Sequence, residues 1–170
     1  MSVMDKSLKS AMIGKRNKAA GDIWESIIEC ACIHYSEAGV AEIEKTPEPM
    51  RPIKRISGGQ FIAVYTKSAQ PDYKGTLRNG FSIVFEAKHT DTDRIKRAVI
   101  TDEQEKRLDK HLALGAECFV LLSFGFNRFF KVPWEVFRYM DRYFGRKYVT
   151  ADDLDKYKIQ YVGGVLEFLG

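Results

Sequence analysis

The sequence predicts an α/β fold, in which a mixed β-sheet is flanked by helices and carries a projecting basic stalk or loop. Three observations lead to this prediction. Apolar residues recur at three- and four-residue steps between Ala20 and Tyr35, as on the buried face of a helix. The pair Asn79-Gly80 separates two strand-like runs, and the run Cys118–Phe124 is apolar on both faces, as in a covered strand. The predicted order is helix, strands, helix, strands, helix.

The composition fits one domain. The chain has 170 residues, 45% of them hydrophobic, which is enough for one well-buried core. No apolar run approaches the ~18–20 residues that span a bilayer, and the N-terminus lacks the apolar core of a signal peptide. We therefore expect a cytoplasmic protein with no membrane partner. Its 3 cysteines lie in predicted helix and strand interiors and are expected to be reduced core residues.

Residues 1–18 are expected to form a flexible basic arm ahead of a single domain over residues 19–170. This segment carries five basic residues and one acid, Asp5. Such an arm could lie along a phosphate backbone, although a solvated terminus explains the pattern equally well. The basic residues nearest the domain are Lys15, Arg16 and Lys18.

The first helix carries acids beside its apolar stripe. Asp22, Glu25 and Glu29 are spaced at three, four and seven residues, so they share one flank. A carboxylate there could reach a metal beside the sheet, but acids in this position are usually solvated. Glu25 is therefore a candidate that the helix pattern alone does not decide.

The segment from about residue 50 to residue 67 predicts the stalk. Prolines at 47 and 49 precede it, and paired glycines at 58 and 59 mark its tip, so the chain is expected to project as a loop or ribbon. Its basic residues suit contact with phosphate. These residues are Arg51, Lys54, Arg55 and Lys67.

A predicted hairpin carries the candidate site. Asn79-Gly80 suits a two-residue type I′ turn between Tyr73–Leu77 and the run that starts at Phe81. In perfect register Asp72 would face Ala87, and one bulge at Gly75 would bring it opposite Glu86. Either arrangement brings the two carboxylates close together.

Alternation along the second strand places Glu86 and Lys88 on one face, while Phe85 and Ala87 point to a core. Carboxylate oxygens are the hard ligands that Mg²⁺ prefers, and a lysine adds positive charge for a phosphate. Close, buried carboxylates repel unless a cation lies between them. The alternative is an exposed edge hairpin with ordinary surface charges.

The second half of the chain supplies the rest of the sheet. Thr101 and Gln104 form a capping box for a helix to about Gly115, so Gln104 can be purely structural. His89 is a weak site candidate. The following elements are predicted in order as a central strand, its hairpin partner, a helix with proline at its first position, a short acidic helix capped by Thr150, and a terminal hairpin. Their residues are Cys118–Phe124, Phe129–Val132, Pro133 with Trp134–Met140, the segment after Thr150, and Ile159–Val162 with Val165–Leu169.

Several motifs together resemble the RecU Holliday junction resolvases, which have the restriction-endonuclease-like PD-(D/E)XK nuclease fold. They are Gly21-Asp-Ile-Trp-Glu25, the Lys45–Pro49 stretch, Pro71-Asp72-Tyr73-Lys74-Gly75, Phe85-Glu86-Ala87-Lys88, Gln104 and Cys118-Phe119-Val120. The resemblance implies a homodimeric, Mg²⁺-dependent endonuclease, with Mn²⁺ as the other ion, that nicks four-way DNA junctions symmetrically. It also implies contact with recombination proteins.

The resemblance assigns roles residue by residue. Asp72, Glu86 and the Ala87 carbonyl would bind metal, and Glu25 would contribute an acid from the helix. Lys88 would be the transition-state cation, and Gln104 would organise the site. The basic residues implied to contact DNA are Lys15, Arg16, Lys18, Lys45, Arg51, Lys54, Arg55, Lys67 and Lys74.

The region between Pro49 and Asp72 is shorter than in the cellular enzymes, which suits a phage-encoded version, and the segment after about Arg142 shows no match. Two other functions are also compatible with these residues. One is a nuclease of the same fold that cuts duplex or otherwise branched DNA. The other is a non-catalytic module that binds junctions. A helix-and-sheet interaction protein with incidental acids is a third, weaker reading.

Overall fold

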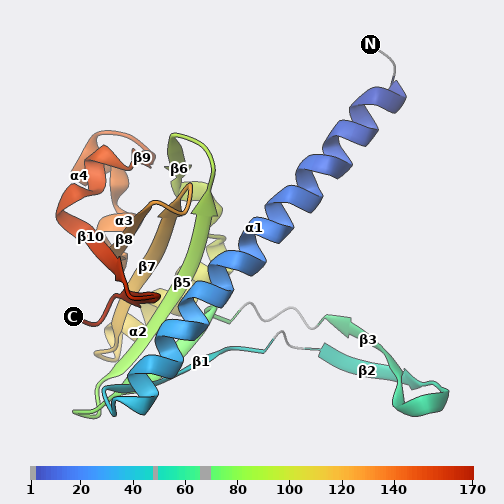
Figure 1. The fold of residues 1–170 in the computed structure, drawn as a ribbon, viewed down its shortest axis with the longest axis horizontal. Helices are drawn as coiled ribbons and strands as arrows, with labels where there is room; N and C mark the ends of the chain where they lie inside the picture. Colours follow the sequence, from blue (N-terminus) through green and yellow to red (C-terminus); the bar gives the residue numbers. More distant parts are fainter. Residues whose placement is uncertain (1–2, 48–49, 66–69) are drawn as a thin grey trace.

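The structure is a computed structural model that describes residues 3–47, 50–65 and 70–170. Its centre is a seven-stranded mixed sheet in the order β1-β4-β5-β7-β8-β10-β11. Helix α1 covers one face of this sheet, and the shorter helices α2, α3 and α4 cover the other (Figure 1). The predicted α/β fold with a mixed sheet between helices is confirmed.

Helix α1 spans Val3–Glu37. Most of the predicted apolar face is buried, including Trp24, Ile28 and Tyr35, whereas Ile23 of that face is exposed. Residues 3–18, which belong to the segment expected to be a flexible basic arm, form the start of this helix. The segment has no proline, and most of its residues favour a helix, so nothing interrupts the helix upstream of its buried half. Residues 12–19 are exposed, and this half projects beyond the sheet (Figure 1).

Strands β1, β4 and β5 form one side of the sheet. Strand β4 pairs antiparallel with both of its neighbours, in the register Lys45↔Tyr73 with β1 and Tyr73↔Phe85 with β5. Gly75 lies so close to β1 that a Cβ atom there would be 2.4 Å from the Glu42 carbonyl oxygen. The bounds are Ala41–Lys45 for β1, Tyr73–Leu77 for β4 and Ser82–Thr90 for β5.

The turn between β4 and β5 differs from the prediction. Leu77 N donates to Phe81 O at 2.8 Å, so three residues, Arg78, Asn79 and Gly80, form the loop. Gly80 has φ 83°, whereas Asn79 is not among the described residues with positive φ, which excludes a type I′ turn. The extra loop residue shifts the register and brings Asp72 level with Glu86, so the expected bulge at Gly75 is not needed.

The predicted stalk is a separate two-stranded ribbon, which we call the β2–β3 hairpin. Strands Met50–Arg55 and Phe61–Tyr65 pair antiparallel, with a register shift between Pro52 and Lys54. A 3₁₀ turn, Ser57–Gly59, forms the tip, where Gly58 and Gly59 both have φ 78°. All residues of β2 are exposed, and the hairpin projects away from the sheet (Figure 1). Lys67 lies outside the described residues.

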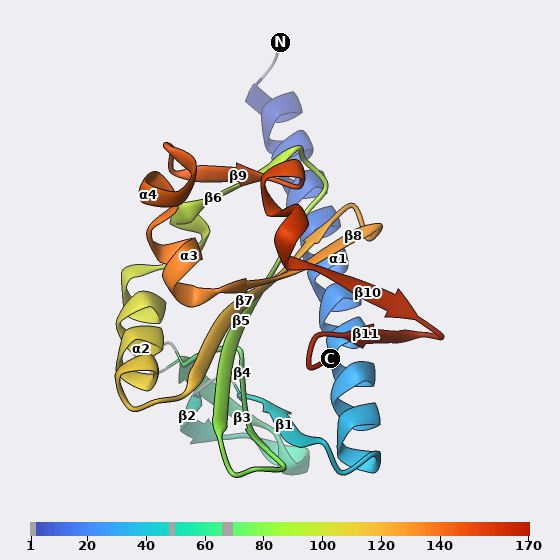
Figure 2. The same ribbon diagram turned by 90° about the vertical axis from the view of Figure 1, so that its left-hand side faces the viewer.

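The connection from β5 to β7 passes over the face opposite α1 (Figure 2). Helix α2 begins with the predicted capping box between Thr101 and Gln104. Strand β7 is the predicted central strand; it pairs parallel with β5 and antiparallel with β8. The bounds are β6 Arg94–Lys96, 3₁₀ turn η2 Arg97–Val99, α2 Asp102–Ala113, β7 Glu117–Phe124 and β8 Arg128–Pro133.

The helix predicted after β8 is broken in two. Pro133 occupies the N-cap rather than the first helical position, and the chain kinks at Tyr139, where φ is −103° and ψ is 42°. Thr150 and Asp153 bond to each other at the start of a 3₁₀ turn. The terminal hairpin is confirmed. The bounds are α3 Trp134–Arg138, α4 Met140–Phe144, β9 Tyr148–Thr150, 3₁₀ turn η3 Asp152–Tyr157, β10 Lys158–Val162 and β11 Val165–Glu167.

The two faces of the sheet bury separate cores. Ile83 and Phe85 of β5 pack with Trp24 of α1, whereas Val84 packs with Leu108 of α2 on the other face. Alternation along β5 therefore directs Glu86 and Lys88 to the α2 side. Among the described residues, no helix is long and apolar enough to cross a bilayer.

Candidate active site

The candidate site lies where β4 and β5 separate. Strand β4 pairs with β5 only over Ser82–Phe85, while β5 continues beside β7 as far as Thr90. Asp72 is the residue before β4, and Glu86 is the first residue of β5 beyond this pairing. Where the two strands separate, one edge of β5 is therefore not paired with β4, and both carboxylates lie next to this edge.

Lys88 lies between the two carboxylates. Its Nζ donates to Asp72 Oδ2 at 3.2 Å and to Glu86 Oε2 at 3.1 Å. Asp72 Oδ2 also accepts a hydrogen bond from the backbone N–H of Ala87 at 3.0 Å. The two acids and the lysine predicted to act together are thus brought together by the fold.

Glu86 is the most unusual member of this group. It is fully buried, with 0% exposure. Burial raises the pKa of its carboxyl to about 8, the charge of Asp72 adds to this, and Lys88 opposes it. Its Oε1 atom is buried and has no hydrogen-bond partner among the described residues. One oxygen of the carboxylate is therefore available for a cation.

Lys88 is largely buried as well, and burial alone would lower the pKa of its ammonium group. The neighbouring carboxylates of Asp72 and Glu86 outweigh this and raise the pKa above its ordinary value. The ammonium group therefore keeps its positive charge at the pH of the cell.

Gln104 reaches the site from α2. Its Nε2 donates to Glu86 Oε2 at 2.5 Å, while its Oε1 accepts from the backbone N–H of Thr101 at 3.1 Å. The sequence left a capping role and a site role as alternatives. The structure combines them, because one end of the carboxamide closes the helix and the other holds Glu86.

The donor set fits a divalent metal. Asp72 and Glu86 offer carboxylate oxygens of the kind that Mg²⁺ binds, with water and phosphate oxygens usually completing the shell. The unpartnered Oε1 of buried Glu86 is the observation that favours a cation here. Over the described part of the chain, no group of three or more acidic, histidine or cysteine side chains is close enough to hold a metal without such additional ligands.

The sequence model of the family RecU, recombination protein U, matches residues 19–169. The chain belongs to the RecU family. The resemblance to the RecU Holliday junction resolvases is thereby confirmed, and the match extends beyond Arg142, where the sequence had offered no comparison. No curated protein matches the chain.

A structural similarity accompanies this RecU match. It is to Hjc of Archaeoglobus fulgidus, described as a Holliday junction resolvase from an archaeal hyperthermophile, with a TM-score of 0.44 and 12% sequence identity. The similarity covers 66% of this chain and 78% of the Hjc chain.

Glu25 does not join the carboxylates of this RecU chain. Its Oε2 accepts a hydrogen bond from Lys45 Nζ at 2.5 Å, and Lys45 also lies 3.9 Å from Glu29. Glu25 and Lys88 both line a cavity of about 560 Å³ between α1 and the end of β5. Metal ligation by Glu25, and by the Ala87 carbonyl, stays a prediction.

The basic residues predicted to contact DNA fall into two groups. Arg51, Lys54 and Arg55 are exposed on β2, and Lys15 and Lys18 are exposed on the projecting half of α1. Three others within the described residues are engaged within the chain, and Lys67 lies outside those residues. Their partners are Asp91 for Arg16 at 2.8 Å, Gln70 for Lys74 at 2.8 Å, and Glu25 for Lys45.

One polar cluster near the site surrounds His89, which the sequence offered as a candidate without its partners. His89 lies with Nδ1 3.0 Å from Ser123 Oγ and Nε2 3.0 Å from Asp91 Oδ1, and its ring stacks on Phe126 at 3.9 Å. Ser123 is fully buried. A serine inside the apolar run of β7 was the available signal, because a buried hydroxyl needs a partner.

Proposed function

We propose that this RecU family resolvase hydrolyses phosphodiester bonds of four-way DNA junctions with Asp72 and Glu86 holding a divalent metal, Mg²⁺ or Mn²⁺. The observation that carries the proposal is the buried Glu86, which lies beside Asp72 and Lys88 and whose Oε1 has no hydrogen-bond partner among the described residues. A buried carboxylate with a raised pKa costs stability without a cation, so selection for binding a cation explains why it is there.

Each side chain has a distinct task. A bound ion would polarise the scissile phosphate and lower the pKa of a water molecule. Lys88 supplies a fixed positive charge for the negative charge that develops on the phosphate. Gln104 holds Glu86 Oε2 and so orients the carboxylate with Oε1 free. Glu25 and the Ala87 carbonyl are additional candidate ligands.

Substrate binding is assigned to the basic surface. The exposed Arg51, Lys54 and Arg55 of the β2–β3 hairpin, with Lys15 and Lys18 of α1, would contact backbone phosphates. Lys45, Lys74 and Arg16 would do so only after release from their partners, and Lys67 completes the predicted set. Symmetric nicks need two sites related by a two-fold axis, so the active form would be a homodimer. It would act in the cytoplasm of a bacterium or of a phage-infected bacterial host, alongside recombination proteins.

The test is cleavage of a labelled four-way junction and of a matching linear duplex, with Mg²⁺, with Mn²⁺ or with EDTA. Wild-type protein should nick opposing strands of the junction symmetrically, and EDTA should prevent this. Asp72→Asn should abolish cleavage and leave junction affinity nearly unchanged, because affinity depends on the basic surface.

Other outcomes would contradict the proposal. Cleavage by Asp72→Asn at the wild-type rate would exclude the metal role of Asp72. Equal cutting of the duplex would indicate a general nuclease of the same fold. Tight junction binding without cutting under any metal would indicate a binding module.

A further inference from the structure

Helix α2 buries little apolar surface against the rest of the chain. Of its residues, which all lie within the described part of the chain, only Leu108 is buried. A helix with so little buried apolar surface gains limited stability from packing. Its position over β5 must therefore be fixed by other contacts.

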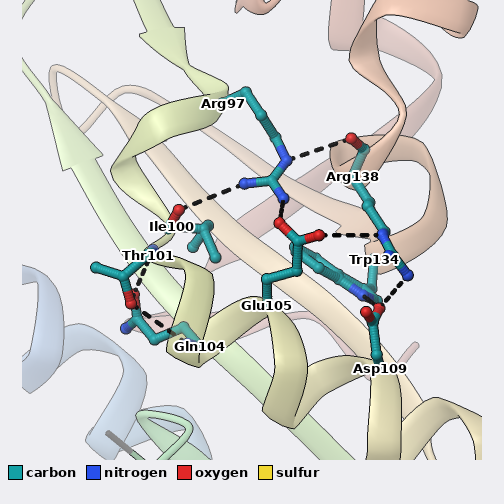
Figure 3. A network of polar contacts seen from close by, with 8 residues as sticks. All are labelled: Arg97, Ile100, Thr101, Gln104, Glu105, Asp109, Trp134 and Arg138. Carbon is teal, nitrogen blue, oxygen red and sulfur yellow. Dashed lines mark hydrogen bonds and ion pairs between the residues drawn. The ribbon is translucent and has the colours of Figure 1, made fainter.

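Those contacts come from Arg97 and Arg138, which bind two carboxylates one turn apart on α2 (Figure 3). Arg97 pairs with Glu105 Oε2, and Arg138 Nε lies 3.4 Å from Glu105 Oε1. Arg138 Nη1 also donates to Asp109 Oδ1 at 2.5 Å. We call these four residues the α2 clamp.

Both Arg97 and Asp109 of the α2 clamp make further contacts with neighbouring segments. Arg97 Nε donates to the Arg138 carbonyl oxygen at 3.2 Å, and its Nη1 donates to the Ile100 carbonyl oxygen at 3.4 Å. The Arg97 guanidinium lies over the aromatic ring of Trp134, 5.2 Å from its centroid. Trp134 Nε1 in turn donates to Asp109 Oδ1 at 2.8 Å. The clamp therefore ties α2 to η2 and to α3.

The residue next to Glu105 is Gln104, which holds Glu86. Gln104 Nε2 donates to Glu86 Oε2 at 2.5 Å, and this contact depends on where the first turn of α2 lies. Its Oε1 is already taken by Thr101, so the carboxamide cannot rotate to compensate for a shift of the helix. A displacement of the first turn would thus change the orientation of the Glu86 carboxylate.

We propose that Arg97, Arg138 and Glu105 are positioning residues for the resolvase reaction, which act through Gln104 on the metal-binding oxygen of Glu86. This inference rests on the proposed function of Glu86. The partly buried ion pairs suit the task, because paired arginines bind carboxylates with defined geometry. Removing a residue that orients a metal ligand typically lowers metal affinity or activity about 10–100-fold.

The experiment uses Glu105→Ala in the full-length protein, since alanine keeps the helix propensity of α2. We expect cleavage of a pre-bound junction to slow about tenfold, with about a tenfold rise in the Mg²⁺ concentration for half-maximal rate. Junction affinity measured in EDTA should not change. The matched control is Glu103→Ala, which removes an exposed glutamate from the first turn of the same helix and should match wild type.

A double-mutant cycle separates positioning from a general loss of stability. If Glu105 acts through Gln104, then Glu105→Ala should have no further effect on the Mg²⁺ requirement in a Gln104→Ala background. If Glu105→Ala raises the Mg²⁺ requirement by the same factor with Gln104 present and with Gln104→Ala, the inference is overturned. If Glu105→Ala does not fold, Glu105→Gln keeps the size and acceptor of the side chain and should give a smaller shift in the same direction.

The same assay separates the two proposals. Wild-type protein that cleaves with Mg²⁺, combined with a cycle that shows no coupling, would overturn the positioning role alone. Wild-type protein that cleaves no junction with any divalent metal would overturn the proposed function, and the positioning role with it.

Discussion

The β2–β3 hairpin and the carboxylate site are built in opposite ways. Every residue of β2 is exposed, and the hairpin contributes basic and apolar side chains to solvent, including Ile53 at 61% exposure. Glu86, by contrast, is fully buried and is bonded to Gln104 and Lys88. In the proposed function, the chemistry is placed in the packed sheet, whereas substrate contact is placed on a separate two-stranded ribbon. Catalysis and binding should then respond to different mutations.

The largest expected effect tests the site half of this comparison. Lys88→Met should slow cleavage by about 10²–10³-fold, because it removes the positive charge that we propose to stabilise the negative charge developing on the phosphate. Junction affinity should change little. The measurement is single-turnover cleavage beside a binding titration in EDTA. A large loss of affinity with an unchanged cleavage rate would break the separation.

The second prediction tests the hairpin half. Replacing Arg51, Lys54 and Arg55 together by glutamine should weaken junction binding by roughly several tens-fold at moderate salt. The slope of log K against log salt concentration should become shallower by about 2–3, as expected for three lost phosphate contacts. The cleavage rate of saturated complexes should stay close to wild type. The triple replacement of exposed acids Asp102, Glu103 and Asp141 serves as a control for altered surface charge. A slowed single-turnover rate at saturation would show that the hairpin also shapes the site.

The third prediction concerns the cost of burying Glu86. A pKa raised from 4.5 to about 8 means that the metal-free protein loses stability as the pH rises from about 4.5 to 8, because in this range the carboxyl ionises in the unfolded chain but stays protonated in the folded protein. Glu86→Gln cannot ionise, so at pH 8.5 it should be more stable than wild type by about 1–3 kcal/mol. The difference should disappear near pH 4. Urea unfolding in EDTA at several pH values measures it.

Metal should act against the stability advantage of Glu86→Gln over wild type. Added Mg²⁺ should stabilise wild-type protein at pH 8.5 and leave Glu86→Gln nearly unaffected, since a ligand that binds only the folded state raises its stability. Equal stabilisation of both proteins would contradict metal binding by Glu86.

The smallest expected effect comes from making the same Ile→Val substitution in each of the two regions. Ile83 is fully buried in the sheet, so Ile83→Val should cost about 0.5–1.5 kcal/mol of unfolding free energy. Ile53→Val on the exposed hairpin should lie within about 0.5 kcal/mol of wild type. Chemical unfolding of both variants is the measurement. A similar cost at both positions would show that the hairpin is covered in solution.

The sequence predicted those features that depend on local patterns. The buried face of α1, the central strand and the capping box of α2 each follow from residues within one or two turns of one another. The grouping of Asp72, Glu86 and Lys88 also followed, because either register considered for the hairpin brings the two carboxylates close and alternation places Lys88 on the face of Glu86.

Other features depend on contacts that no local pattern contains. Arg78 enters the β4–β5 loop only because the pairing of whole strands favours the shifted register. Glu25 pairs with Lys45, 20 residues away, and Arg138 reaches Glu105 and also Asp109, which is 29 residues away. Such pairings between distant segments arise from the packed fold, so the sequence left them open.

The place where the β2–β3 hairpin leaves the sheet has a consequence for how such enzymes can vary. Lys45 and Tyr73 are register partners, and Thr46 N donates to the Asp72 carbonyl oxygen at 2.9 Å. The intervening segment therefore departs and returns at a single closed base. Its length can change by insertion or deletion without moving the strands that carry the carboxylates, so the reach of the hairpin and the chemistry of the site are free to evolve independently.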